Sequence, residues 1–299
     1  LGEAAGVTVG WSEDEWDKDY ALDKKFRPYD YVMAIEAKKG DKVAKEWARP
    51  SIENYNKLHG HIEQKSLEFI RTNASAKKPF YLAYWPNLPV RPPAKLPGEK
   101  WTTSAANWYA DGVEDLDKTI GKVIEELKKQ GIAENTLVIA MADNGPMLEA
   151  FPAMSTFGLY TGGKGAFTEG GVRVPAFVRW PGTIEAGSVA GDIIHVTDLY
   201  TTFANLGGAK KHIPTDRVID GVDQTALFLN GDTKGRRDYV HIYTGPLLAA
   251  TVKQQFKRHW VGDRPGLAGK GFFDLYRDPK EQQPMMAQFL WAWEPFDSM

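Results

Sequence analysis

The 299-residue sequence contains no cysteine. This absence excludes disulfides, zinc–thiolate sites, iron–sulfur clusters and a cysteine nucleophile. No apolar run approaches the roughly 20 residues that a helix needs to span a bilayer, so we expect no membrane partner. Neither sign of charge dominates, with 37 Lys and Arg against 39 Asp and Glu. This balance argues against a general nucleic-acid binder.

The sequence also opens without an initiator Met, a basic start or the apolar core of a signal peptide. We interpret this opening as a processed start or as part of a longer chain. The composition is 42% hydrophobic and 12% aromatic, which is enough to bury a core and argues against disorder. At roughly 100–200 residues per domain, the length predicts one large domain with an appendage, or two domains.

The first two thirds of the chain alternate between helical and strand patterns. Apolar residues recur at helical spacing from Ser51 onward, and residues 79–85 then predict a buried strand. The clearest pattern is an amphipathic helix over 109–127 with Gly131 as its C-terminal cap, followed by an apolar strand over 136–142. This order is typical of a mostly parallel or mixed sheet with helices on both faces.

The pattern changes in the C-terminal part of the chain. Before this change, we expect a strand over 172–182 and short helices near 197–206 and Asp223. From Asp238 onward, short β runs predict a small antiparallel sheet: 239–243, 247–252, 256–261 and 271–276. We therefore expect an α/β fold with a mostly parallel or mixed central sheet flanked by helices. It would form a domain over 1–235, followed by an antiparallel β subdomain over 236–299.

Asp143 and Asn144 are the first candidates for chemistry, because they end the apolar strand over 136–142. In open parallel sheets, ligands bind at the carboxyl ends of strands. A carboxylate and an amide oxygen are hard ligands suited to Ca²⁺ or Mg²⁺. The alternative is a simple Asx turn, since Asn144-Gly145 is a good turn dipeptide.

Lys164 is the second candidate, within the glycine-rich segment 161–165. Glycines let backbone N–H groups and an ammonium approach an anion together. The spacing from Gly158 to Lys164 also fits a phosphate-binding P-loop, but Gly165 follows where Ser or Thr is required, so we reject a nucleotide hydrolase. The alternative is a surface loop with a solvated lysine. The six histidines show no metal-ligand spacing, and each is better interpreted as structural.

The order of these segments resembles the sulfatase family of the alkaline-phosphatase superfamily, over roughly residues 60–283. The segments that carry the resemblance are VEDLDKTIGKVIEELKKQGIAENTLVIAMADNG, GGKGAFTEGGVRVPAFVRWPG, HVTDLYTTFANLGG, IDGVD and FFDLYRDPKE. The family implies hydrolysis of sulfate esters at a divalent cation, usually Ca²⁺, with Mg²⁺ as the alternative. It implies that Asp143 and Asn144 bind the metal, and that Lys164 contacts the sulfate and assists the leaving group.

The sequence departs from this family at two places. Where members carry His in a P-H-x-P setting, this chain has Asn87. An amide can bind a sulfate oxygen but cannot donate a proton to the leaving group. The family's nucleophile is a formylglycine made from Cys or Ser in a short C/S-x-P/A-x-R motif, and neither the motif nor any Cys is present. By resemblance, the chain is a sulfatase that lacks the N-terminal part with this motif.

We therefore expect a truncated or divergent sulfatase-family hydrolase of impaired activity, acting on a small anionic ester with weak metal binding or none. One alternative is a phosphodiesterase or promiscuous ester hydrolase of the same superfamily. Another is a non-catalytic remnant, an anion-binding module or half of a split protein, which would need an N-terminal complement or form a homo-oligomer. The family also implies a periplasmic or extracellular location, although the chain shows no signal peptide.

Overall fold

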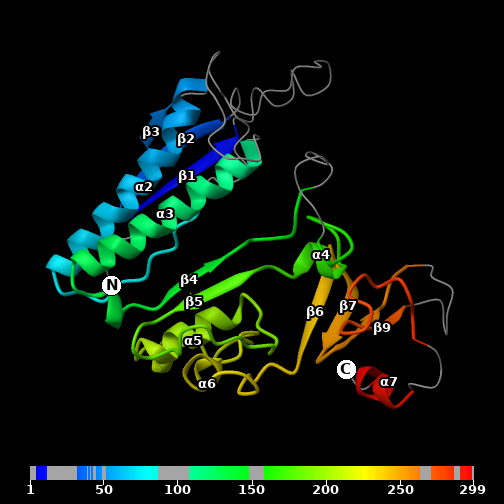
Figure 1. The fold of residues 1–299 in the computed structure, drawn as a ribbon. Coiled ribbons are helices and arrows are strands. Elements are labelled where there is room, and N and C mark those ends of the chain that lie inside the picture. The colour runs from blue at the N-terminus through cyan, green and yellow to red at the C-terminus, as the bar shows by residue number, and fades with distance from the viewer. Residues whose placement is uncertain are drawn as a thin grey trace. The chain divides into compact units, whose positions relative to one another are not determined.

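The computed structural model describes residues 5–11, 32–38, 40, 42, 45–48, 52–86, 108–147, 158–262, 271–285 and 290–297. The chain forms two compact units, Leu1–Ala133 and Glu134–Met299 (Figure 1). The C-terminal sheet belongs to the second unit, together with the residues from 134 onward. The domain boundary that we expected at 235–236 stays a prediction.

The first unit contains a small sheet and two long helices. Its strands β1 (Ala5–Trp11), β2 (Val32–Lys38) and β3 (Lys45–Ala48) pair antiparallel in the order β1-β2-β3. The helices are α2 (Ile52–Ser75) and α3 (Trp108–Lys129), which contact each other. Both helices predicted from the apolar spacing are confirmed.

Apolar and polar contacts both stabilise this helix pair. Leu58 and Ile70 of α2 and Leu127 of α3 are almost fully buried. The buried hydroxyl of Thr119 donates to Glu63 at 3.1 Å and lies 2.9 Å from Nε2 of His59. The contact from His59 agrees with its interpretation as a structural histidine.

Gly131 caps α3 as predicted. Its φ is 70°, which is the left-handed conformation that glycine adopts without strain. Gly131 N–H donates to Lys128 O at 2.9 Å, and Ile132 N–H donates to Leu127 O at 3.0 Å. These two bonds form a Schellman motif, which satisfies the last carbonyls of the helix.

The buried strand predicted over 79–85 is wrong. These residues form no strand, and Tyr81 and Trp85 are exposed. Exposure alternates along the segment, and Phe80 packs its ring edge-on against Phe69 of α2, with centroids 5.8 Å apart. The aromatic run is therefore extended with one covered side, but none of the described strands pairs with it. A sequence run can predict an extended conformation, yet the partner strand must come from elsewhere.

The second unit begins within a short turn, which is followed by a two-stranded sheet. The 3₁₀ turn η2 (Ala133–Asn135) leads to β4 (Val138–Met141), which pairs antiparallel with β5 (Ala176–Arg179). Short helices follow, and η3 is a 3₁₀ turn: α4 (Glu169–Val172), α5 (Asp198–Leu206), η3 (Lys210–His212) and α6 (Thr225–Asn230). The strand expected to start at Val172 is thus shorter, because its first residue closes α4.

The C-terminal antiparallel sheet is confirmed. Its strands pair in the order β6-β7-β8-β9, with bounds Tyr239–Thr244, Leu247–Lys253, Phe256–His259 and Phe272–Asp274. Helix α7 (Leu290–Asp297), which the sequence did not predict, covers this sheet (Figure 1). Phe256, Phe272, Ala292 and Phe296 form the apolar cluster between them.

The fold is therefore of the α/β class, as expected. Every strand pair among the described residues is antiparallel, so the parallel or mixed central sheet is not among them. An apolar run fits either pairing direction, because only the connections between strands decide it. None of the helices in the described part of the chain is long and apolar enough to cross a membrane.

Candidate metal and anion site

The turn after β4 carries the two candidate metal ligands. Asn144 N–H donates to Oδ1 of Asp143 at 2.9 Å, and Asn144 Nδ2 donates to Gly145 O at 2.7 Å. Asp143 is exposed and Asn144 is half-buried. These bonds engage one carboxylate oxygen and the amide nitrogen. The other carboxylate oxygen and the amide oxygen are the atoms that a cation would meet.

The glycine-rich loop with Lys164 is hydrogen-bonded to this turn at two points. Lys164 N–H donates to Pro146 O at 2.9 Å, and Gly145 N–H donates to Gly171 O at 3.0 Å. The structure therefore attaches Lys164 to the same pair of loops as Asp143 and Asn144. Of the four predicted site residues, these three are joined.

Glycine is required where the two loops touch. A β-carbon on Gly145 would lie 1.8 Å from Gly170 O of the lysine loop, and within that loop a β-carbon on Gly171 would lie 2.1 Å from Ala166 O. Gly162 also has a φ of 86°, in the left-handed region that favours glycine. The glycines therefore serve backbone packing at least as much as anion approach.

The Lys164 side chain is exposed, and no salt bridge to it is found in the part of the chain that the structure describes. Its ammonium is thus available to an external anion. The solvated lysine that we considered as an alternative has the same local geometry. What distinguishes the two interpretations is the attachment of this lysine to the turn with Asp143.

The donor atoms suit a divalent cation in kind but not in number. Ca²⁺ takes six to eight oxygen ligands, several of them charged. Asp143 and Asn144 offer one carboxylate and one neutral oxygen. Within the described ranges, no group of three or more His, Asp or Glu side chains could hold a metal ion. Asp143 and Asn144 by themselves therefore do not form a complete metal site.

Asn87 lies outside the described residues. Its role in binding sulfate stays a prediction.

A group of buried charged side chains, which the sequence did not predict, contacts the loop that carries Lys164. Lys257 is fully buried, with Nζ 3.0 Å from Glu169 and 3.4 Å from Glu281. His259 Nε2 lies 2.5 Å from Oε2 of Glu281. Glu169 and Glu281 stand in two of the segments that resemble sulfatases, but nothing in the sequence indicated that they share a cation.

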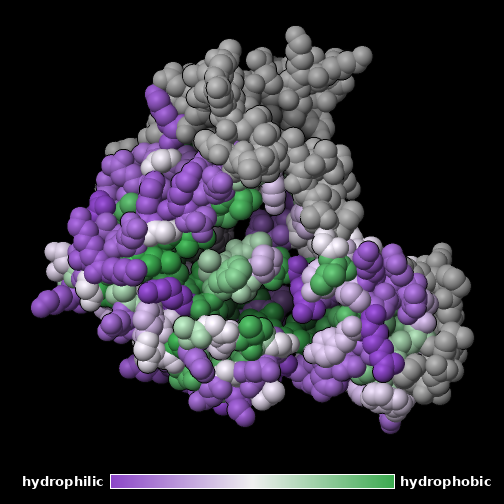
Figure 2. Space-filling view, viewed as in Figure 1, coloured by the Kyte–Doolittle hydropathy of each residue, from purple (hydrophilic) through white to green (hydrophobic). Residues whose placement is uncertain are grey.

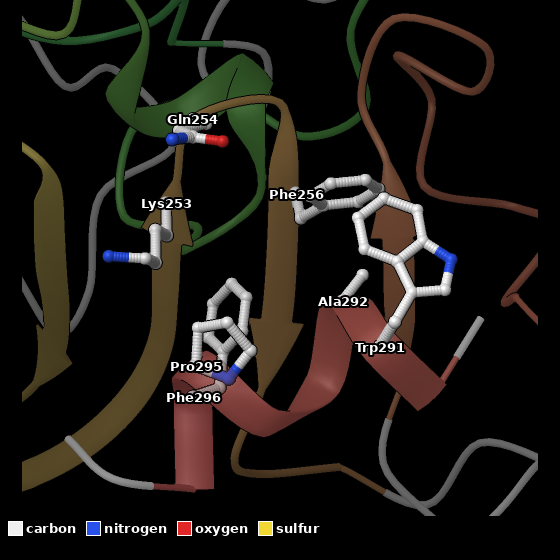
Figure 3. Close-up of a pocket in the computed structure, with 7 residues that line it drawn as sticks. All are labelled: Lys253, Gln254, Phe256, Trp291, Ala292, Pro295 and Phe296. Atoms are coloured by element: carbon white, nitrogen blue, oxygen red, sulfur yellow. The ribbon is translucent and has the colours of Figure 1, made fainter.

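A small aromatic pocket lies elsewhere in the second unit, between α7 and the β7–β8 hairpin. In Figure 3, Trp291 and Phe256 form one wall, and Pro295 and Phe296 lie on the other side of the pocket. Its remaining lining residues are Lys253, Gln254 and Ala292. None of the predicted site residues lines this pocket, so the candidate site is not located there.

Comparison with known proteins decides the family. A model of the Sulfatase family matches residues 4–209, which is more than half of the chain. The chain belongs to the sulfatase family. The resemblance stated from the sequence is therefore confirmed.

Relatives of the chain include sulfatases of known name. The chain is 36% identical over 197 residues to N-acetylgalactosamine-6-sulfatase of Rattus norvegicus, covering 66% of the chain and 37% of that enzyme. It is 32% identical over 210 residues to steryl-sulfatase of Rattus norvegicus, covering 59% and 36%. The fold is similar to the PsFucS1 sulfatase of Pseudoalteromonas sp., with a TM-score of 0.76 and 30% identity over 87% of this chain. The chain spans 54% of that sulfatase and little more than a third of the two curated relatives.

Proposed function

We propose that this chain carries the metal- and sulfate-binding part of a sulfate-ester hydrolase. Asp143 and Asn144 would face a divalent cation, Ca²⁺ or else Mg²⁺. Lys164 and Asn87 would contact the sulfate. The observation that supports the proposal is the hydrogen bond from Lys164 N–H to Pro146 O, which joins the lysine loop to the turn of the acid–amide pair.

The chemistry of these groups suits an anionic ester. The Lys164 ammonium lowers the energy of negative charge, and its effect is largest where charge develops on the leaving oxygen. A divalent cation beside Asp143 would supply further neutralisation of the sulfate. Asn87 can donate a hydrogen bond through its amide but holds no proton for the leaving group. These residues thus supply groups that bind the ester, but no proton donor for its cleavage.

Turnover by this chain alone is expected to be slow. The formylglycine nucleophile implied by the family cannot form, because the 299 residues contain no Cys and no Ser in the required motif. An alcohol nucleophile would be left as a stable sulfate ester. Each missing acid or base commonly costs about 10²–10⁴-fold in rate. We expect at most slow hydrolysis of activated esters.

The proposal is tested by hydrolysis of nitrophenyl sulfate and nitrophenyl phosphate by the purified chain. Lys164→Ala and Asp143→Ala should lower any sulfate-ester turnover, whereas Lys211→Ala, an exposed lysine on η3, should leave it unchanged. Turnover that is indifferent to the first two substitutions would favour a non-catalytic remnant. A faster rate with the phosphate ester would favour the phosphodiesterase alternative.

We also propose that this chain associates with a partner that completes its sheet. Among the described residues, β4 and β5 pair only with each other. Phe177 on β5 is 72% exposed, and Met141 at the end of β4 is also exposed. Figure 2 shows apolar surface in the region of these strands. The partner that we propose for these open edges is the N-terminal part of a sulfatase, because the formylglycine motif that the family carries there is absent from these 299 residues.

Gel filtration with and without the N-terminal half of a sulfatase-family member tests this association. A stable complex with sulfatase activity would support it. A homo-oligomer that buries the same strands would instead favour self-association of this chain. A periplasmic or extracellular location, expected from the family, is likewise a proposal, which fractionation of the producing cells would test.

A further inference from the structure

Four titratable side chains form a buried quartet in the second unit. Lys257 and Glu281 are fully buried, and His259 and Glu169 are exposed by only 2% and 4%. The two carboxylates share the Lys257 ammonium, at 3.0 and 3.4 Å, and His259 bonds the second one. Lys257 and His259 belong to β8, Glu169 begins α4, and Glu281 follows β9.

Burying four titratable side chains in a core is energetically unfavourable compared with burying apolar ones. Removing charges from water is unfavourable, and apolar side chains of similar volume often serve stability as well as a buried ion pair does. Glu281 carries a second cost, because its φ of 53° lies in the left-handed region that side chains other than Gly and Asn rarely adopt. Backbone strain at a buried charge points to a role beyond packing.

The quartet contacts the loop that carries Lys164 after that residue, and Lys280, the neighbour of Glu281, contacts the loop before it. Oε1 of Glu281 accepts the backbone N–H of Glu169 at 2.6 Å. The Phe167 ring packs edge-on against His259, with centroids 5.0 Å apart. Before the lysine, the Thr161 hydroxyl donates to the carbonyl of Lys280, the neighbour of Glu281, at 2.8 Å.

These contacts fix the loop at Thr161 and at residues 167–169, and Lys164 lies between these two points. Its own backbone bond to Pro146 is the link to the turn with Asp143. If the quartet released the loop, both the lysine and this link would lose their fixed position.

We infer that the buried quartet positions Lys164. Through it, the C-terminal sheet forms part of the anion site rather than a separate appendage. The role of Lys164 in this inference rests on the proposed function. Of the four residues, Glu281 is the central positioning residue, because it contacts the backbone of the Lys164 loop as well as Lys257 and His259.

Hydrogen exchange of the loop amides tests the positioning directly. The reporters are the amides of Lys164 and Gly170, which donate to Pro146 O and Thr161 O. In Glu281→Ala, their exchange should rise by about tenfold or more, while the amides of β6 and β7 keep their protection. Glu281→Gln should stay close to the parent chain, because its amide oxygen still accepts the Glu169 N–H. Glu294→Gln, an exposed change of the same charge on α7, is the matched control.

Sulfate affinity tests whether the effect passes through Lys164. Titration with inorganic sulfate should give weaker binding for Glu281→Ala and for Lys164→Ala. The double variant should bind no more weakly than Lys164→Ala alone, because the two changes remove the same interaction. Additive losses would overturn the inference, and so would unchanged exchange of the loop amides in Glu281→Ala.

The two proposals fail in different ways. If Lys164→Ala does not weaken sulfate binding, the proposed function fails, while the exchange measurement still decides the positioning. If Glu281→Ala does not fold, His259→Phe supplies the same comparison. That variant keeps an aromatic ring against Phe167 and removes the hydrogen bond to Glu281. Exchange of the loop amides should then rise, and an unchanged rate would overturn the inference.

Discussion

Gly145 and Gly170 touch so closely that a β-carbon on Gly145 would lie 1.8 Å from the carbonyl oxygen of Gly170. Backbone atoms cannot move aside as a flexible side chain can. Gly145→Ala should therefore force the two loops apart and break the bonds from Gly145 N–H to Gly171 O and from Lys164 N–H to Pro146 O. We expect a loss of about 1–3 kcal/mol in the free energy of unfolding, as for an overpacked core.

Denaturant titration of Gly145→Ala measures this loss. Gly191→Ala is the control in the same unit, since its β-carbon would meet only Asp232, at 3.8 Å. Equal stability of the two variants would contradict the close packing of the loops.

The metal site should be weak in this chain alone. Asp143 contributes one carboxylate and Asn144 one neutral oxygen, so we expect Ca²⁺ to bind no better than about millimolar, by comparison with other low-charge sites. Calorimetric titration with CaCl₂ measures the affinity. Micromolar binding would show that other parts of the chain supply ligands. Asp143→Ala should then abolish the binding if the site is the one proposed.

Asp198 should make the second unit sensitive to acid. Burial by itself would raise the pKa of Asp198, but hydrogen bonds from Arg237 and from the backbone amides of His195 and Val222 hold the pKa below its ordinary value of 3.8. A lowered folded-state pKa contributes stability above the unfolded-state pKa, and this contribution is lost as the pH falls through the folded-state value. Stability should therefore decrease progressively as the pH falls below about 4.

Urea unfolding at pH 7, 5, 4 and 3 tests this pH dependence. Asp198→Asn should lower stability at pH 7 and flatten the dependence below pH 4. Glu185→Gln, at an exposed position, should leave the dependence unchanged. The same acid sensitivity in Asp198→Asn as in the parent chain would assign the effect to other groups.

Two apolar positions on α3 differ in how deeply the folded structure buries them, although both fit the same helical pattern. Leu127 and Val113 both occupy apolar positions of α3, but Leu127 is 2% exposed and Val113 is 43% exposed. Leu127→Ala should cost about 2–5 kcal/mol of unfolding free energy, the range for a buried leucine. Val113→Ala should change it by about 0.5 kcal/mol or less, as for a surface position. Thermal unfolding followed by circular dichroism compares them, and equal losses would contradict the observed burial.

Local patterns in the sequence determined much of the secondary structure. The apolar spacing of α2 and α3, the cap at Gly131 and the four strands of the C-terminal sheet are all properties of neighbouring residues, which a periodic pattern reveals. The segments around Asp143 and Lys164 also identified the family, because their residue types and order are specific. The proximity of Asp143 and Lys164 was expected only from that resemblance.

The tertiary structure decided what depends on distant partners. The aromatic run over 79–85 predicted a buried strand, but no described strand pairs with it, and the side chains of Tyr81 and Trp85 are exposed. The quartet joins Glu169 to residues 88 and 112 positions later, and no local pattern indicates such pairings. A lone lysine, a histidine and two glutamates each looked like ordinary polar residues in the sequence. Only the folded chain removes them from water together, and that shared burial is what gives the four residues a common role.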